Sequence, residues 1–393
     1  MAQIYKRITA DDRSFISQET TTGLWTGDTG SLSTLYTSDT QIAKANSKYF
    51  IDVYNADPAT TSSAAVQFSL GYGNRFGSGS PTLTQQNTST RSAQAVYLQL
   101  KNLLLESTDT QFSFANSSTS NQIYAIVISR SRYKGYVDSG NWQLTLSGSE
   151  GAFHFIDDSS QTLGTKRSFA KNGLVFNVAS GSLTGTQGST VVSTSSTSSA
   201  ATAKGFGLFY PQKGIIILNA DVIGAHVGFK ARTGSLGHIM DNSTGAGENT
   251  SSAAVFISAS SSTNTIPRAP FTGSLAGTGG VYQDQYNWHG LYRSMVLGAQ
   301  DTAFTARSAE IISSNHYFLR LNNKEFNYSN NPSFATGSNG QLSNQDFEND
   351  PKVYVTTVGL YNDSNELLAV AKLSRPLEKS FSKEALLRVR LDF

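Results

Sequence analysis

The carboxyl end of the chain carries the pattern that most limits its possible folds. Every second residue from Leu387 to Phe393 is apolar, and the residues between them are Arg388, Arg390 and Asp392. Successive side chains of a β-strand point to opposite faces, so this period of two predicts a strand with one buried face. Because the alternation continues to the last residue, we predict that this end belongs to a sheet and is not a frayed tail.

Two further strands are predicted just before this one. Residues 353–360 and 367–373 are rich in Val, Leu and Ala, and a polar turn, Asn-Asp-Ser-Asn at 362–365, separates them. Three strands in succession would form a meander. An unpaired strand at 387–393 would be an aggregation hazard. We therefore expect it to pair beside 353–360 or 367–373, or to join the sheet of a neighbouring chain.

Strand patterns also dominate the middle of the chain. The run Ile-Tyr-Ala-Ile-Val-Ile at 123–128 is typical of a strand buried on both faces. The alternation at 142–146 predicts a half-buried strand. Residues 207–210 and 215–218 are apolar and flank Pro-Gln-Lys-Gly at 211–214. Proline first and glycine last favour a tight turn, so we predict a hairpin there.

Helix is expected to be a minor component. Residues 92–106 show helical spacing, with Lys101 and Asn102 opposite the apolar face. That face comprises Val96, Tyr97, Leu100, Leu103 and Leu104. A second, weaker helical pattern covers residues 302–312. The predicted fold class is mainly β with a few helices, built from antiparallel sheets or a sandwich with a Ser/Thr/Gly-rich β insertion in the middle.

The insertion is inferred from a shift in composition. Residues 180–203 are almost wholly Gly, Ser, Thr, Ala and Val, and 241–252 are similar, which is typical of long loops or edge hairpins. We therefore predict three parts. Residues 1–146 form an amino-terminal β-rich part with the helix, and 147–265 form the β insertion. Residues 266–393 form a carboxyl-terminal meander that packs with the amino-terminal part.

Charge and cysteine content exclude several classes of function. Charged residues make up 15% of the chain and the net charge is +2, which favours neither nucleic acid nor a membrane surface as partner. The chain has no cysteine, so disulfides, thiolate metal sites and cysteine nucleophiles are excluded. We see no signal peptide and no run approaching the about 18 apolar residues of a membrane span. We expect a soluble protein made in the cytosol.

A glycine-rich motif resembles the start of a dinucleotide fingerprint. Gly71-Tyr-Gly73-Asn-Arg-Phe76 has Phe76 in the place of the third glycine, and no helix follows directly to bind a pyrophosphate. We therefore interpret it as a glycine-rich loop. No Gly-Lys pair occurs, so a Walker-type phosphate loop is absent from the sequence.

No metal or catalytic motif is recognisable. The five histidines are His154, His226, His238, His289 and His316. None is spaced for metal chelation, and no Gly-x-Ser-x-Gly elbow occurs. We therefore predict no metal site, no cofactor and no catalytic residue, and we expect that the chain is not an enzyme.

Two pairs of adjacent carboxylates need an explanation. Asp11-Asp12 and Asp157-Asp158 are interpreted as helix starts or surface turns, because neighbours on a strand point to opposite faces and do not share a site. The two carboxylates of a glycosidase need not be close in sequence, so this interpretation leaves a hydrolase open.

A modest basic cluster also has two interpretations. Arg130, Arg132 and Lys134 are interleaved with Tyr133 and Tyr136, as in a nucleic-acid-binding stripe. With a net charge of only +2, we favour a solvated strand end or a charged contact with a neighbouring subunit.

Several of these segments resemble known virion proteins. Residues 355–376, 387–393 and 323–334 look like parts of virion proteins of large contractile-tailed phages, in particular phages of cyanobacteria and other marine bacteria. Residues 95–105 and 209–218 are similar to segments of the same group. Together these segments cover about a third of the chain. The group has no catalytic or ligand motif that could be carried over to residues of this sequence.

The resemblance implies a structural virion protein, namely a baseplate (wedge) component that joins other tail proteins. It implies a homo-oligomer within a symmetric virion ring, made in the host cytoplasm, with neither nucleic acid nor membrane as partner. One alternative is a receptor-binding or adhesin protein whose insertion presents loops to host glycan. Others are a neck or tail-fibre-attachment protein and a polysaccharide hydrolase, which would need two carboxylates within about 10 Å in a cleft.

Overall fold

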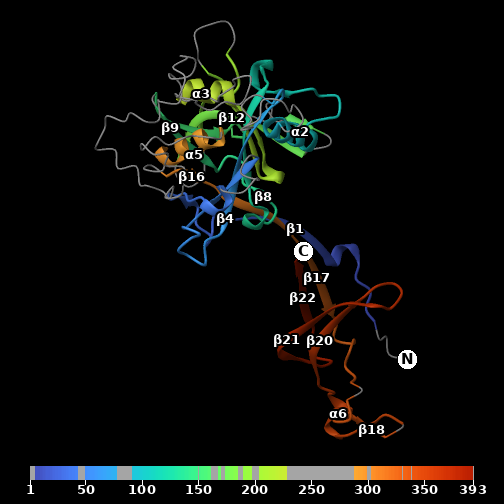
Figure 1. Ribbon diagram of the computed structural model, residues 1–393. Helices are drawn as coiled ribbons and strands as arrows, with labels where there is room; N and C mark the ends of the chain where they lie inside the picture. The colour runs from blue at the N-terminus through green and yellow to red at the C-terminus, as the bar shows by residue number, and fades with distance from the viewer. Residues whose placement is uncertain are drawn as a thin grey trace, which may run out of the picture. The chain divides into compact units, whose positions relative to one another are not determined.

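The computed structural model divides the chain into two compact units (Figure 1). Unit 1 comprises Met1–Thr20 and Ile311–Phe393, and unit 2 comprises Thr21–Glu310. The structure describes residues 5–42, 49–77, 91–148, 150–160, 167–169, 173–184, 189–196, 203–227, 287–298, 302–329, 331–337 and 339–392. The predicted fold class is confirmed, because the structure is mainly β, with 48% strand and 18% helix, and its sheets are antiparallel.

Unit 2 is built on one large antiparallel sheet, in which twelve strands of the described part of the chain take part. Ten of them follow one another along its main path. In spatial order these are β2 (Ser31–Leu32), β16 (Phe304–Thr305), β9 (Gln143–Gly148), β10 (Gly151–Asp157), β12 (Gly173–Leu183), β14 (Gly207–Tyr210), β15 (Ile215–Asn219), β7 (Gln122–Ile128), β4 (Val66–Asn74) and β3 (Phe50–Tyr54). The other two, β11 (Arg167–Phe169) and β13 (Ser189–Ser193), pair with β12.

The central strands of this sheet are buried on both faces, as predicted for residues 123–128. In β7, Tyr124 and Ile126 belong to one apolar cluster, whereas Ile123 and Ala125 belong to another. β15 divides its side chains between the same two clusters. Side chains that alternate between two apolar environments explain why these strands read as continuous apolar runs.

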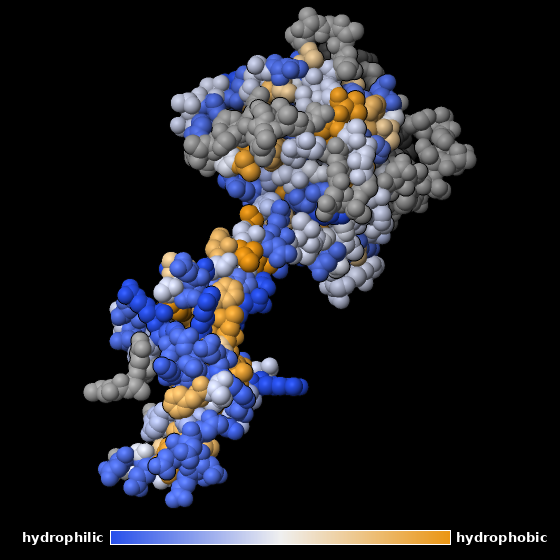
Figure 2. Space-filling model, turned by 180° about the vertical axis from the view of Figure 1, so that it is seen from behind, coloured by the Kyte–Doolittle hydropathy of each residue, from blue (hydrophilic) through white to orange (hydrophobic). Residues whose placement is uncertain are grey.

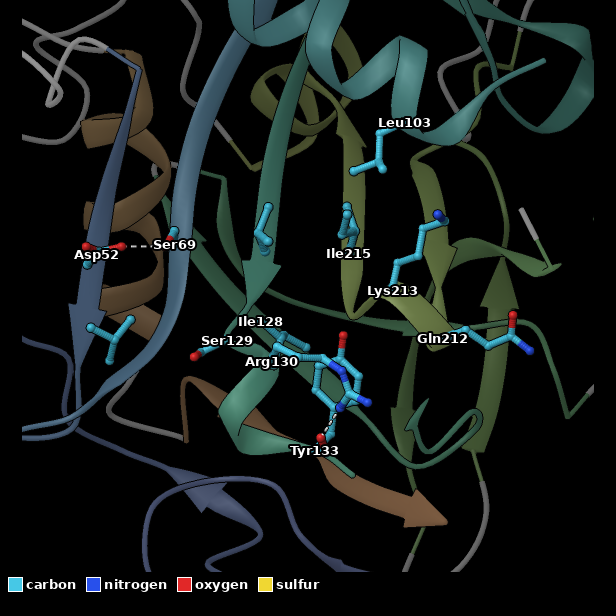
Figure 3. A pocket seen from close by; sticks show the side chains of 12 residues that line it. Asp52, Ser69, Leu103, Ile128, Ser129, Arg130, Tyr133, Gln212, Lys213 and Ile215 are labelled. Atoms are coloured by element: carbon cyan, nitrogen blue, oxygen red, sulfur yellow. Dashed lines mark hydrogen bonds between the residues drawn. The ribbon is translucent and has the colours of Figure 1, made fainter. Parts of the chain in front are cut away.

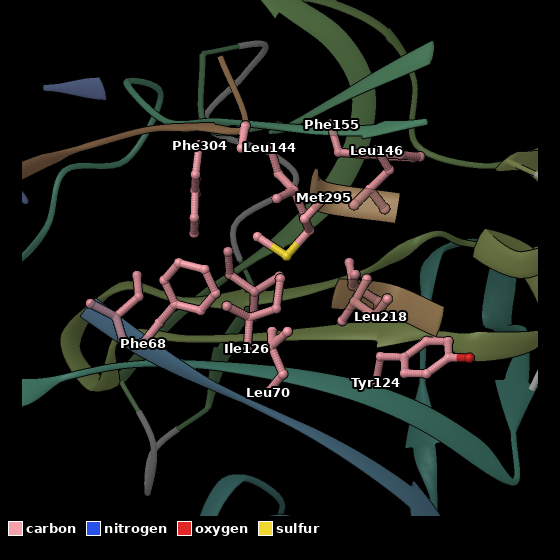
Figure 4. Packing of buried hydrophobic residues seen from close by; sticks show 14 of the residues in the cluster. Phe68, Leu70, Tyr124, Ile126, Leu144, Leu146, Phe155, Leu218, Met295 and Phe304 are labelled. Carbon is pink, nitrogen blue, oxygen red and sulfur yellow. The ribbon is translucent and has the colours of Figure 1, made fainter. Parts of the chain in front are cut away.

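The larger cluster, here called the inner core, fills the curl of the sheet. Figure 4 shows Leu144, Leu146 and Phe304 on one side and Leu70 and Ile126 on the other, with the side chain of Met295 between them. Met295 belongs to α5 (Asn287–Gly298), which contacts β9 and β4. Thr145 in β9 is also fully buried. The strand predicted as half-buried is therefore covered on both faces.

The predicted hairpin is confirmed. β14 and β15 pair antiparallel, with Tyr210 opposite Ile215. The turn η6 (Pro211–Lys213) ends at Gly214, whose φ of 60° lies in the left-handed region that favours glycine.

The second cluster, here called the outer core, lies between the opposite face of the sheet and α2 (Ser92–Leu104). The predicted helix at 92–106 is confirmed, and Tyr97, Leu100 and Leu104 of α2 are buried. Leu103 was expected on the same face, but its side chain, in the last turn of α2, is 45% exposed. Remaining elements of unit 2 are α1 (Asp39–Ile42), β5 (Phe112–Ser113), β6 (Thr119–Ser120), β8 (Tyr136–Val137), α3 (Ala220–Val227), η4 (Ala115–Ser117) and η5 (Arg130–Arg132).

The glycine motif lies in strand β4 and not in a loop, which corrects our interpretation. Gly71 and Gly73 face α2, and a Cβ atom at Gly73 would lie 2.9 Å from the backbone nitrogen of Tyr97. The glycines therefore permit close packing of a helix on a strand. The helix that follows them covers the sheet.

We predict that Gly73→Ala lowers the free energy of unfolding by about 1–3 kcal/mol, because its methyl group would push α2 away from β4. Gly71→Ala is the matched control. Its methyl group would lie 3.3 Å from the Tyr49 carbonyl oxygen and 3.6 Å from Val96, so we expect a smaller loss. Denaturant melts of both variants measure this. If both substitutions lowered the free energy of unfolding equally, the close approach of α2 to Gly73 would not be the cause.

Unit 1 contains two small antiparallel pairings packed through a shared apolar cluster. β17 (Arg307–Leu321) pairs with β22 (Ala385–Asp392), and β20 (Val353–Tyr361) pairs with β21 (Leu367–Lys379). Val389 clusters with residues of the other pair. β1 (Arg13–Gly23) pairs with β17, so the sheet order is β1–β17–β22. Smaller elements are η1 (Ala10–Asp12), β18 (Ala335–Thr336), β19 (Gln341–Leu342) and α6 (Asp346–Asn349).

This arrangement corrects the predicted meander. β20 and β21 form a hairpin as expected, but β22 pairs with β17, with Val389 opposite Tyr317. The strand prediction for the carboxyl end is confirmed up to Asp392, whereas Phe393 lies outside the described residues. A period of two identifies the buried face of a strand, but the apolar face of β22 would fit beside several strands of this composition.

The second predicted helix, at 302–312, is wrong. These residues contain β16 and the start of β17. Phe304 pairs with Leu144 and Leu32, and Ser308 pairs with Val137. Pairing on two sides and burial in the inner core outweigh a weak local helical spacing.

The predicted three-part division also differs from the structure. β10, β12, β14 and β15 all come from the expected insertion, 147–265, yet they lie between β9 and β7 in the sheet. The boundary between the units falls at Glu310 and not near 265. Composition identified the Ser/Thr/Gly loops, but the apolar strands between those loops complete the sheet. Residues 241–252 lie outside the described residues.

A fully buried lysine organises one end of unit 1. The ammonium group of Lys379 donates to the carbonyl oxygens of Asn323 at 3.0 Å and Ser380 at 2.9 Å, and to Oδ1 of Asn327 at 2.9 Å. Burial lowers the pKa of Lys379. Its three donors all have acceptors, so the charge holds the loop at 323–327 against the end of β21.

We predict that Lys379→Met lowers the free energy of unfolding by about 2–4 kcal/mol, because three acceptors lose a charged donor. Lys383→Met is the control, since Lys383 makes an exposed ion pair with Glu378 at 2.7 Å. We expect the control to melt like the natural chain. Thermal and chemical melts compare the two, and indistinguishable melts would rule out this role for Lys379.

Candidate functional site

A depression of about 660 Å³ lies on the sheet of unit 2, beyond the carboxyl end of α2 (Figure 3). Its floor follows one row of paired residues across four strands. Asp52 in β3 is opposite Ser69 in β4, Ser69 is opposite Val127 in β7, and Val127 is opposite Ile215 in β15. The exposed side chain of Leu103 from α2 lies at its edge. The site is thus built where the helix stops covering the sheet.

The rim of the depression carries opposite charges. At one end the Asp52 carboxylate accepts a hydrogen bond from the Ser69 hydroxyl at 2.5 Å. Arg130, the first residue of η5, donates to the carbonyl oxygens of Tyr133 and Lys134, and its guanidinium lies 4.6 Å from the centre of the Tyr133 ring. Lys213 from η6 also lines the site.

The side chains that line the depression combine apolar and charged groups. The apolar part of the floor, Val127 and Ile215, lies between a carboxylate and two cations, so the depression can hold an apolar group with polar ends. The described side chains that line it include no histidine to act as a general base beside a serine. In the described residues, moreover, no group of three or more His, Asp or Glu side chains is arranged to hold a metal ion.

The histidines are separated in the structure. Nδ1 of His154 is 3.0 Å from the Thr145 hydroxyl, and His226 is surrounded by Phe153, Phe155 and Phe206. Burial lowers the pKa of His226. His316 is in β17, where its ring stacks on Phe318. His238 and the side chain of His289 lie outside the described residues.

The pair Asp157-Asp158 is buried, which corrects our interpretation of a surface turn. Both side chains are 0% exposed. Asp157 accepts hydrogen bonds from the backbone nitrogens of Gly140 at 2.8 Å and Ser159 at 2.9 Å. Asp158 accepts from the backbone nitrogen of Asn177 at 2.9 Å and from its side-chain amide at 2.7 Å.

Burial raises the pKa of Asp157, whereas the hydrogen bonds from Gly140 and Ser159 partly oppose this and the nearby Asp158 adds to it. The two carboxylates therefore satisfy donors of the backbone and of a neighbouring strand. The other pair of adjacent carboxylates, Asp11 and Asp12, lies in unit 1. It forms part of the short helical turn η1, as expected for a helix start or turn.

We predict that the two buried carboxylates respond differently to amidation. Asp157→Asn should lower the free energy of unfolding by about 1–3 kcal/mol, because two fixed backbone donors would face one remaining acceptor. Asp158→Asn should be nearly neutral. Oδ1 of Asn177 is buried and has no hydrogen-bond partner among the described residues, so the Asn177 amide can turn over and accept from the new side chain.

The pH dependence provides a second readout. A raised pKa means that the folded chain binds this proton more tightly than the unfolded chain, so stability is lost as pH rises through that pKa. The Asp157→Asn variant should lack this part of the acid profile, and Asp158→Asn should retain it. Chemical melts between pH 3 and 7 measure both effects. A neutral Asp157→Asn variant would contradict the assignment.

The basic cluster makes its contacts within the chain. Arg132 donates to the Thr26 hydroxyl at 2.6 Å, and Lys134 forms an ion pair with Glu310 at 3.1 Å. Arg130 donates to two backbone carbonyl oxygens, as described above.

Unit 1 exposes an unusual amount of apolar surface. Thirteen of the twenty large apolar side chains that are exposed among the described residues belong to this unit, which holds about a third of the described residues. They are Tyr5, Phe15, Ile16, Ile311, Phe326, Tyr328, Tyr354, Tyr361, Leu367, Leu368, Val370, Phe381 and Leu386. Figure 2 shows one face of this surface, with hydrophobic residues exposed among hydrophilic ones. The sequence patterns located the strands, but not the faces that they leave bare.

Comparison with protein-family models, curated proteins and solved structures found no match to this chain. In the part of the chain that the structure describes, no helix is long and apolar enough to cross a membrane.

Proposed function

We propose that this chain is a structural subunit of the tail of a contractile-tailed phage, and that it joins other tail proteins in the baseplate, as a wedge component. Its site of action is the virion, and it is synthesised in the host cytoplasm. It has no catalytic role in this proposal. The observation that carries the proposal is the contrast between the well-filled cores of unit 2 and the bare apolar surface of unit 1.

The core of unit 1 is thin. Among its described apolar side chains the best buried, Phe334 and Val389, are still 5% exposed, whereas many in unit 2 are at 0%. A two-stranded pairing is marginally stable by itself. Exposed apolar patches on this scale are typical of surfaces that bind other proteins. Unit 1 is therefore the part of the chain best suited to be covered by neighbours.

The resemblance to virion proteins supports the same assignment. Three of its five segments, 323–334, 355–376 and 387–393, belong to unit 1. The first includes the loop that Lys379 holds, and the other two contribute to β20, β21 and β22. The segments that resemble tail proteins are thus concentrated in the unit with the exposed apolar surface.

Localisation on particles tests the proposal. Antibodies raised against the purified chain would be applied to intact contractile-tailed particles and detected with gold in the electron microscope. We expect label at the distal end of the tail. Label at the neck or on fibres would support the attachment alternative and overturn the baseplate position. Absence of the chain from purified particles of a phage that expresses it would overturn the proposal.

A variant pair tests the role of the bare surface. Leu368 and Val370 project from one face of β21 and are 67% and 59% exposed. We predict that Leu368→Glu with Val370→Glu leaves the melting temperature nearly unchanged but abolishes incorporation into particles, since exposed substitutions alter stability by about 0.5 kcal/mol or less. Val192→Glu in unit 2, at a side chain that is 77% exposed, is the control and should be incorporated normally. Incorporation is measured by quantitative blotting of purified particles.

A further inference from the structure

The part of β1 that belongs to unit 1 is bare on both faces. All seven residues from Arg13 to Glu19 are exposed. Phe15 is 65% exposed and its neighbour Ile16 is 50% exposed. Adjacent residues on a strand point to opposite faces, so each face of β1 carries a large apolar side chain that the described residues leave uncovered.

β1 is also an edge strand. In the order β1–β17–β22, no other described strand pairs with it. Natural edge strands are usually protected by charged side chains, above all lysine, by proline or by a covering segment, because their free backbone groups can pair with another strand. The two charged residues of β1, Arg13 and Glu19, have opposite signs and stand at the ends of the exposed stretch. β1 contains neither proline nor lysine. The opposite edge, β22, carries Arg388 and Arg390, whose like charges would oppose each other if two copies of that strand met.

The sequence of β1 is complementary to itself. If two copies run antiparallel about a two-fold axis at Ile16, Arg13 of each copy lies opposite Glu19 of the other, and Ser14 lies opposite Gln18. Ile16 then faces Ile16, and Phe15 lies opposite Ser17 and diagonal to the second Phe15, within reach of an aromatic side chain. Shifting the strands to another register separates Arg13 from Glu19.

We propose that two copies of this chain associate through β1, with the strands antiparallel and Ile16 on the two-fold axis. The pairing joins the sheets of two copies into one, whose main path of six strands is β22–β17–β1–β1–β17–β22. It satisfies the free backbone groups of both edges and covers apolar side chains on both faces. This inference deepens the proposed function by naming one partner, a second copy, and it stands on β1 even if the position in the tail is different.

Single cysteines test the register directly, because the chain contains none of its own. In the proposed pairing the two copies of residue 16 are directly opposite, with Cα atoms about 4.5–5.5 Å apart, a separation that a disulfide can span. Residue 14 lies about 14 Å from its copy, which is too far. We expect Ile16→Cys to form a covalent dimer under mild oxidation and Ser14→Cys to remain uncrosslinked. Equal crosslinking of both variants, or none of Ile16→Cys, would overturn the register.

Sedimentation of the full chain tests the association itself. We expect a dimer, and we expect Ile16→Lys to weaken it about 100-fold, because two apolar side chains are lost from the contact and two like charges meet. Ile311→Lys is the control, since Ile311 is 57% exposed on β17, which is not an edge strand. It should leave the dimer intact. A monomeric natural chain would overturn the proposal, whatever its place on particles.

Reversing the charges of Arg13 and Glu19 distinguishes loss of the dimer contact from a general loss of folding stability. Arg13→Glu alone and Glu19→Arg alone should each weaken the dimer, because like charges then face each other across the pair. The double variant restores two opposite-charge pairs and should recover the affinity of the natural chain. Circular dichroism of all three variants confirms that they are folded. Failure of the double variant to recover while folded would contradict the antiparallel pairing about Ile16.

Discussion

Burial of the central strands on both faces is the constraint on which the structure of unit 2 depends. β7 and β15 contribute alternate side chains to the inner and outer cores, so each core is built partly from the same two strands. A change at Ile126 would affect one core, whereas displacement of the β7 backbone would affect both. The two larger helices pack on neighbouring strands of the same sheet, α2 on β4 and α5 on β9 and β4.

Sequence patterns correctly predicted the elements whose structure is determined by neighbouring residues. The hairpin at 207–218 follows from its own turn, because Pro211 and Gly214 fix the backbone between two apolar runs. The helix α2 was predicted from the spacing of its own side chains. In both cases the information lies within about fifteen consecutive residues, so no knowledge of the rest of the chain was needed.

The predictions that were wrong concern contacts between residues far apart in the sequence. Asp157 and Asp158 resemble turn residues by composition, but their partners are Gly140 on one side and Asn177 on the other. The partner of β22 is β17, some seventy residues earlier, and several strands would have matched its apolar face. The floor of the depression joins residues from 52 to 215 in one row, a juxtaposition that no sequence spacing records.

The division of unit 1 between the two ends of the sequence has a consequence for synthesis. Tyr5 packs against Tyr361 and Lys6 pairs with Glu325, so these two residues find their partners only after more than three hundred further residues have been translated. Unit 2 is complete once residue 310 has emerged, and domains generally fold as they leave the ribosome. Residues 5–20 therefore remain unpaired after unit 2 has folded, and the apolar side chains of β1 have no partner until β17 is complete. A nascent chain of this design would need either rapid translation or a chaperone during that interval.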